Sequence, residues 1–273
     1  MRLMLFSVIA GFLSMSFAMR AEGAEKADFG PKRVLAFYYA WYTTKAFSGQ
    51  DRHIESVDLE KKEIGNWRHF PASGPYDSLD PATIERHMRQ MKESGIDGPI
   101  VSWWGRQRYD DAALPLILES AARHGLVVSA YYETTPGDPP ANETAAASLA
   151  YIVKTYADHP AWLRVQDRPV IFIYSRAVNQ IQPATRWTAI REMVKSQTGV
   201  EPFLIGDGMS DNVAAVFDGV HQYNTAGQQR GLSGPDETRR AVTEIALASE
   251  MTARRYGRLA CYTIIPGYDD TKN

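Results

Sequence analysis

The stretch Val34–Tyr42 reads VLAFYYAWY, an unbroken run of apolar and aromatic residues. Such a run is typical of a β-strand that is buried on both faces, as the strands of a parallel sheet are. The run therefore predicts the first strand of a covered parallel sheet. Similar runs follow it along the chain, at residues 99–104, 126–133, 170–174, 202–206, 219–223 and 259–265.

Amphipathic segments between these runs predict helices. Asp80 and Pro81 are suited to the N-cap and first position of a helix, and Gly95 is suited to ending it. Only the long polar stretch at residues 43–78 interrupts the pattern, and its length predicts a functional loop. Further helices are expected at residues 110–124, 143–157, 184–197 and 237–256.

The alternation of strands and helices predicts an α/β fold, a (β/α)8 TIM barrel. About seven β/α units are recognisable and the last is missing, so two strand edges would stay unpaired. We therefore expect the barrel to be incomplete at the C-terminus. An open doubly wound sheet is the alternative, but no Gly-x-Gly-x-x-Gly motif follows the first strand.

Composition excludes several classes of function. The 273 residues carry 30 Lys and Arg against 32 Asp and Glu, a formal net charge of -2, which provides no basic surface for nucleic acid. The single cysteine, Cys261, excludes an intramolecular disulfide framework. No His, Asp and Glu set has metal-ligand spacing, so we expect no metal and no cofactor.

The N-terminus has the pattern of a secretory signal peptide. Arg2 precedes an apolar run from Leu3 to Ala18, which is too short to span a membrane comfortably. We expect residues 1–23 to be the signal peptide and residues 24–273 to be one barrel domain. The mature protein would then be secreted or periplasmic, with no stable membrane anchor after cleavage.

Aromatic and acidic residues gather where the predicted strands end, which is where (β/α)8 barrels carry their chemistry. Flat aromatic faces and planar polar groups are what sugar recognition needs, so an oligosaccharide or polysaccharide is the expected ligand. Neighbouring residues on a strand face opposite ways, so only one of Trp103 and Trp104 can point into the cleft. The expected substrate-binding residues are Tyr39, Tyr42, Trp103, Trp104, Glu133, Tyr223, Tyr268 and Asp269.

Several motifs resemble those of the endo-α-mannosidase family of glycoside hydrolases, family 99, and occur in the same order. The resemblance implies a (β/α)8 barrel that cleaves internal α-mannosidic bonds with retention and without a metal. It also implies that Glu133 contacts the sugar near the cleavage point. The matching motifs are FYYAWY (37–42), GPYDSLDP (74–81), IERHMRQM (84–91), SWWG (102–105), YE (132–133), FDGV (217–220) and PGYDDT (266–271).

One family feature is missing. The family's acid/base and assisting carboxylates lie on a Glu-Trp-His-Glu-like segment at strand eight, and these 273 residues contain no copy of it. The resemblance therefore places the catalytic carboxylates beyond Asn273, and the 273-residue chain by itself is expected to be inactive. Two alternatives stay open: a non-catalytic carbohydrate-binding barrel, and a glycosyltransferase-associated barrel in polysaccharide export.

Overall fold

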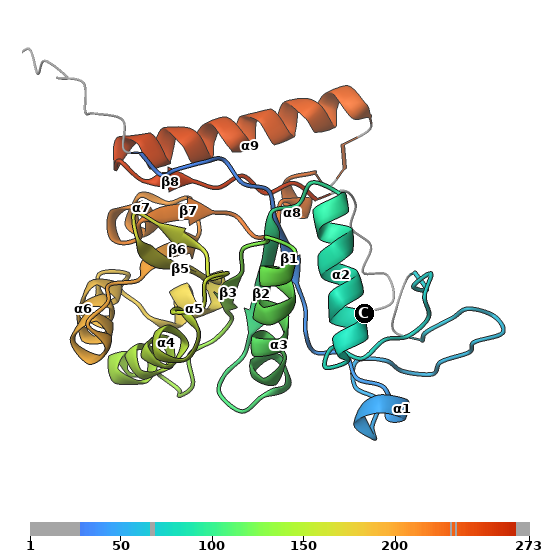
Figure 1. The fold of residues 1–273 in the computed structure, drawn as a ribbon. Helices are drawn as coiled ribbons and strands as arrows, with labels where there is room; N and C mark the ends of the chain where they lie inside the picture. Colours follow the sequence, from blue (N-terminus) through green and yellow to red (C-terminus); the bar gives the residue numbers. More distant parts are fainter. Residues whose placement is uncertain (1–27, 66–68, 230, 233, 266–273) are drawn as a thin grey trace, which may run out of the picture.

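The computed structural model describes residues 28–65, 69–229, 231–232 and 234–265. The predicted signal peptide, Tyr268 and Asp269 lie outside these residues. Within them, the predicted parallel sheet is confirmed, and its strands follow one another in the order β1-β2-β3-β5-β6-β7-β8 (Figure 1). The seven strands are β1 (Leu35–Tyr38), β2 (Gly98–Trp103), β3 (Ser129–Tyr132), β5 (Arg168–Ile173), β6 (Phe203–Asp207), β7 (Gly219–His221) and β8 (Leu259–Ala260).

Every neighbouring pair in this order is parallel, and the curled sheet has seven of the eight strands of a (β/α)8 barrel. The strands β1 and β8 stand at the two ends of the order and do not pair with each other. One further strand, β4 (Arg164–Val165), pairs antiparallel with β5 and was not predicted. Among the described helices, none is long and apolar enough to cross a membrane.

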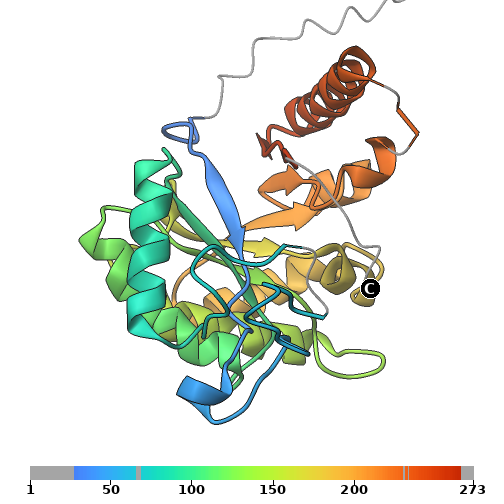
Figure 2. The ribbon, with the colours of Figure 1, turned by 90° about the vertical axis from the view of Figure 1, so that its right-hand side faces the viewer.

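Helices cover the outer face of the sheet, as Figure 1 shows for α2, α3, α4 and α6. The longest, α9, packs against β7 and β8 at one edge of the sheet (Figure 2). The four shortest helices were not predicted, because segments of four to six residues carry too little periodicity. The helices are α1 (Lys45–Ser48), α2 (Pro81–Glu93), α3 (Tyr109–Arg123), α4 (Asn142–Tyr156), α5 (Ser175–Gln180), α6 (Arg186–Thr198), α7 (Asp211–Val216), α8 (Ala226–Gln229) and α9 (Pro235–Arg255).

The predicted first strand extends too far. It ends at Tyr38, so Trp41 and Tyr42 lie on the segment that follows β1. The last strand is likewise shorter than the predicted 259–265. Aromatic and β-branched residues favour extended backbone both inside a sheet and in an ordered segment beyond it, so composition does not mark the end of a strand.

The sheet separates two apolar cores. On β5, Val170 and Phe172 point into the barrel, whereas Ile171 and Ile173 point outward to the helices. This alternation follows the pleat of a strand. The inner core contains Ile100, Tyr131, Leu163, Val170, Phe172, Phe203 and Ile205.

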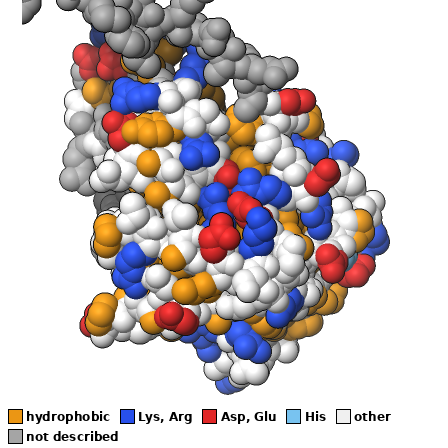
Figure 3. Space-filling model, turned by 90° about the vertical axis from the view of Figure 1, so that its left-hand side faces the viewer, with side chains coloured by type: hydrophobic (Ala, Val, Ile, Leu, Met, Phe, Trp, Pro, Cys, Tyr) orange, Lys and Arg blue, Asp and Glu red, His pale blue; other side chains and the backbone are white. Residues whose placement is uncertain are grey.

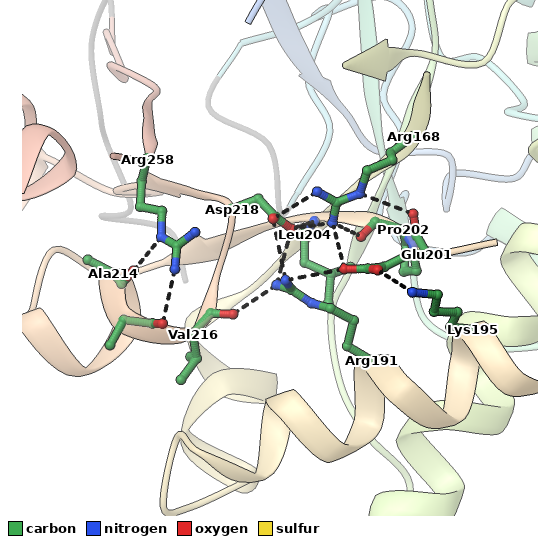
Figure 4. A network of polar contacts seen from close by, with 11 residues as sticks. Arg168, Arg191, Lys195, Glu201, Pro202, Leu204, Ala214, Val216, Asp218 and Arg258 are labelled. Carbon is green, nitrogen blue, oxygen red and sulfur yellow. Dashed lines mark hydrogen bonds and ion pairs between the residues drawn. The ribbon is translucent and has the colours of Figure 1, made fainter. Parts of the chain in front are cut away.

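A charged network holds the amino ends of β5, β6 and β7 together (Figure 4). Asp218 lies just before β7 and accepts hydrogen bonds from Arg168 at 2.9 and 3.0 Å and from the Leu204 N–H at 3.0 Å. Arg191 of α6 also pairs with Asp218, and Glu201 pairs with both arginines. The space-filling view from this side shows basic and acidic side chains gathered together (Figure 3). The network lies at the opposite end of the strands from the expected site.

Candidate functional site

Glu133 directly follows β3 and points into the barrel. Its N–H donates to the Trp103 carbonyl oxygen at 3.1 Å, so the parallel pairing continues one residue beyond the strand. On β3, Tyr131 belongs to the inner core and Tyr132 to the outer one, so the pleat returns Glu133 to the inside. The side chain is only 5% exposed, and its Oε1 accepts a hydrogen bond of 2.6 Å from the Ser102 hydroxyl.

Burial makes the Glu133 carboxyl group a weaker acid than an ordinary glutamate side chain. Loss of solvation disfavours the carboxylate and raises the pKa of Glu133 to about 7, with smaller contributions in the same direction from Asp110 and Asp207. The Ser102 hydrogen bond and the Arg176 guanidinium oppose this rise. Near neutral pH the group therefore exchanges readily between acid and carboxylate, which is what proton transfer to a sugar oxygen requires.

The indole of Trp104 lies beside this carboxyl group. Its Nε1–H donates to the Ser102 oxygen at 3.0 Å, and its backbone N–H donates to Asp110 at 2.5 Å. The guanidinium of Arg176 lies over the indole ring, 4.9 Å from its centroid. Two polar anchors and one cation therefore hold the Trp104 ring in a single orientation.

An aromatic wall continues from Trp104 to the far side of the barrel. Trp41 lies 6.0 Å from Trp104 and stacks on Tyr39 with centroids 4.9 Å apart. The Tyr39 hydroxyl hydrogen-bonds to the Tyr223 hydroxyl, which comes from the segment after β7. Burial and this bond raise the pKa of Tyr39, so the phenol stays protonated. The result is a row of flat rings suited to the C–H faces of sugars.

A cavity of about 330 Å³ opens at the carboxyl ends of β5, β6 and β7. Asp207, the last residue of β6, forms part of the cavity wall, as does Tyr223, whose hydroxyl meets that of Tyr39. Its lining combines rings with hydroxyl, amide and carboxylate groups. The lining residues are Tyr174, Ser175, Asp207, Gly208, Met209, Gln222, Tyr223 and Asn224.

The structure brings together four of the residues expected at the site: Tyr39, Trp104, Glu133 and Tyr223. Tyr42 lies at the edge of this group, where its ring meets Trp41 edge-on with centroids 6.4 Å apart.

Trp103, the other tryptophan of the pair, points away from the barrel interior. It is 1% exposed in the outer core, and its Nε1–H donates to Asp111 at 2.8 Å. Its inclusion among the sugar-binding residues is therefore corrected, because the pleat that turns Ser102 inward turns Trp103 toward the helices.

Ser102, Arg176 and Asp207 were missing from the expected substrate-binding residues, although Asp207 directly follows the predicted strand at residues 202–206. Alternation along β2 carries a signal for Ser102, because the residue before an outward Trp103 must point inward. Arg176 had no such signal, because it lies on the short helix α5. Among the described residues, no group of three His, Cys, Asp or Glu side chains could hold a metal ion.

The sequence profile of Glycosyl hydrolase family 99 matches residues 31–272 of this chain. The chain belongs to this family. The match includes every described strand and all the site residues named above, so the resemblance inferred from the motifs is confirmed.

Curated relatives point to the same family. The chain is 29% identical over 228 residues to the glycoprotein endo-alpha-1,2-mannosidase of Rattus norvegicus, covering 74% of this chain and 47% of that protein. It is 25% identical over 244 residues to a glycoprotein endo-alpha-1,2-mannosidase-like protein of Mus musculus, covering 74% and 53%. The chain thus spans about half the length of the curated relatives it matches.

A solved family 99 structure shares the fold. The endo-alpha-mannosidase of Bacteroides thetaiotaomicron superposes with a TM-score of 0.65 at 26% identity, covering 83% of this chain and 67% of that one. The seven-stranded sheet of this chain is therefore part of a (β/α)8 barrel of the family 99 type, as predicted.

Proposed function

We propose that this chain carries the glycan-binding part of a glycoside hydrolase that acts on α-mannoside glycans with retention of configuration. The observation that carries the proposal is the Glu133 carboxyl group, buried beside the Trp104 ring at the strand ends of a family 99 barrel. The names of the relatives in Rattus norvegicus and Bacteroides thetaiotaomicron support an α-mannoside as the ligand.

The proposed site would work through two kinds of contact. The rings of Trp41, Tyr39 and Trp104 would stack on the apolar faces of mannose units. Glu133 would hydrogen-bond a sugar hydroxyl, as acceptor when it is a carboxylate or as donor when it is protonated, because its pKa of about 7 leaves both forms populated.

Retaining cleavage requires a pair of acidic groups near the scissile bond. Among the described residues at the strand ends, Asp207 accepts three hydrogen bonds from the protein, and Asp110 accepts one from the Trp104 N–H. Of these three carboxyl groups, only Glu133 accepts no hydrogen bond from a backbone N–H of the described residues; its partner is the Ser102 hydroxyl. This favours a second candidate for the 273 residues alone, namely glycan binding without turnover.

One experiment tests both candidates. The purified protein is titrated with α-1,2-mannobiose and with α-mannan oligosaccharides by calorimetry, and the same mixtures are assayed for new reducing ends. We expect saturable binding without new reducing ends. No binding to either ligand would refute the proposed function, and new reducing ends would place the catalytic acidic groups within these residues.

Glu133→Gln tests the role of the carboxyl group, with Glu85→Gln as the matched control. Glu85 also accepts a hydrogen bond from a serine hydroxyl, Ser120 at 2.7 Å, but it lies on the outside between α2 and α3. We expect Glu133→Gln to weaken mannobiose binding about tenfold, because a hydrogen bond to a charged group contributes about 1.5–3 kcal/mol. Glu85→Gln should leave the affinity unchanged.

We also propose that the protein is exported and that residues 1–23 are removed. The basic Arg2 and the apolar run from Leu3 to Ala18 support this. Mass spectrometry of the intact protein from the secreted or periplasmic fraction tests it. An N-terminus at Met1 in that fraction would contradict cleavage.

A further inference from the structure

The carboxylate of Asp207 lies beneath the aromatic wall and connects several strand ends. Its Oδ1 accepts the Tyr223 N–H at 2.9 Å, and its Oδ2 accepts the Ser175 N–H at 3.0 Å. The Tyr131 hydroxyl donates to Oδ2 at 3.4 Å. The three donors come from the ends of β3, β5 and β7, and Asp207 itself ends β6.

These bonds occupy most of what the carboxylate can offer. Two carboxylate oxygens have about four lone-pair positions, and three of them already face protein donors. The side chain is 7% exposed, so little of it is left for a ligand. His221, its partner across the sheet, adds no positive charge, because burial lowers the pKa of this histidine to about 4. The carboxylate of Asp207 is therefore used for hydrogen bonds within the protein and not for binding a ligand.

The first segment that Asp207 holds carries Tyr223. The backbone bond to Oδ1 fixes this residue where its ring stacks on Tyr131, with centroids 5.7 Å apart, and where its hydroxyl meets Tyr39. Tyr39 in turn stacks on Trp41. The position of one end of the row of rings therefore depends on this hydrogen bond.

The second segment is the start of α5. Ser175 is the first residue of this helix, and its N–H has no carbonyl partner within the helix. The next residue, Arg176, places its guanidinium over the Trp104 ring and 5.6 Å from the centroid of Tyr174. Through Oδ2, the carboxylate therefore also holds the residue next to Arg176, whose guanidinium lies over Trp104 at the other end of the row of rings.

We propose that Asp207 is a positioning residue of the glycan site, which positions Tyr223 and Trp104 at the two ends of the row of rings by holding the Tyr223 and Ser175 amides. This inference rests on the proposed function, because it names a residue that shapes the same site. It assigns Asp207 no contact with the glycan.

Asp207→Asn tests the proposal, with Asp218→Asn as the matched control. A side-chain amide has one acceptor oxygen and one donor group, so the substitution would turn an N–H toward one of the two backbone amides. Asp218 is equally buried, 8% against 7% exposed, and also accepts a backbone N–H, but it lies at the other end of the neighbouring strand. Both variants therefore lose a buried carboxylate of the same sheet.

Two readouts are measured under conditions where each variant is fully folded. The first is the affinity for α-1,2-mannobiose, and the second is hydrogen exchange at the amides of residues 175 and 223. We expect Asp207→Asn to weaken binding about tenfold and to speed exchange at both amides, since a charge-assisted hydrogen bond is lost at each. Asp218→Asn should leave both readouts unchanged. Equal losses of affinity in the two variants, or an unchanged affinity in Asp207→Asn, would overturn the proposal.

Ser175→Pro provides a second variant in case Asp207→Asn does not fold. Proline is tolerated at the first position of a helix, where its missing N–H costs no helical bond. Tyr174 already has the extended backbone, φ -66° and ψ 148°, that precedes a proline. We expect weaker mannobiose binding, and unchanged binding would overturn the role of the Ser175 bond.

The exchange measurement separates this inference from the proposed function. If the unmodified protein binds no mannoside, the proposed function fails. Hydrogen exchange at residues 175 and 223 then tests the positioning role of Asp207 by itself. Faster exchange confined to residues 175 and 223 would support its role in holding the two ends of the row of rings. Unchanged exchange would overturn it.

Discussion

The hydroxyl of Ser102 donates a hydrogen bond of 2.6 Å to Glu133 and accepts one of 3.0 Å from the indole of Trp104. One buried side chain thereby couples the carboxyl group of the proposed site to its nearest aromatic ring. Ser102 is 2% exposed, so no solvent replaces either bond. The charge state of Glu133 and the orientation of Trp104 should therefore respond to the same substitution.

Ser102→Ala should raise the pKa of Glu133 above about 7, because it removes a hydrogen bond that favours the carboxylate. It should also destabilise the fold by about 1–3 kcal/mol, since the Trp104 Nε1–H loses its acceptor. The pKa is measured by NMR titration of Glu133 and the stability by urea unfolding. Ser129→Ala is the control, because Ser129 is also buried but donates to the Val170 carbonyl oxygen. A lower pKa in Ser102→Ala would contradict the prediction.

Glu133 should make the protein less stable as the pH rises. Its pKa is about 7 in the folded protein against 4.5 for the ordinary side chain, so the folded state keeps a proton that the unfolded chain has released. The free energy of unfolding therefore falls between about pH 4.5 and 7. The difference between the protein and Glu133→Gln isolates this effect, which is on the order of 3 kcal/mol. Parallel stability curves for the two proteins across this pH range would show that Glu133 has an ordinary pKa.

Truncation of Trp103 should mainly reduce stability, whereas truncation of Trp104 should mainly reduce glycan affinity. Trp103→Ala should cost about 3–5 kcal/mol of stability, because it empties a place in the outer core. Trp104→Ala should weaken mannobiose binding with a smaller loss of stability, because its ring is only partly buried. Thermal unfolding and calorimetric titration of both variants check this. An undiminished affinity in Trp104→Ala would remove this ring from the proposed site.

Asp218→Asn should destabilise the protein by about 2–4 kcal/mol, because it leaves Arg168 and Arg191 partly buried with less negative charge beside them. Urea unfolding measures the loss. Asp211→Asn is the control: Asp211 also pairs with an arginine, Arg255, but both side chains are more than half exposed. Such exposed pairs contribute about 0–1 kcal/mol, so equal losses in the two variants would contradict a special role for the network.

The sequence by itself determined the class of fold and the family. Near-continuous apolar runs separated by amphipathic segments require a covered parallel sheet, because only such a sheet buries both faces of every strand. The position of Glu133 at the end of the third predicted strand placed it at the carboxyl edge for the same reason. The end of the first strand was less certain, and Trp41 and Tyr42 proved to lie beyond it.

The tertiary structure alone decided which side chains meet. Alternation showed that Trp103 and Trp104 face opposite ways, but both faces of the strand are apolar, so nothing in the pattern told which face is inside. Tyr39 and Tyr223 are 184 residues apart and touch only because the sheet curls. The pKa of Glu133 and the hydrogen bonds of Asp207 to Ser175 and Tyr223 likewise depend on burial and on donors from other strands, which exist only once the barrel has formed.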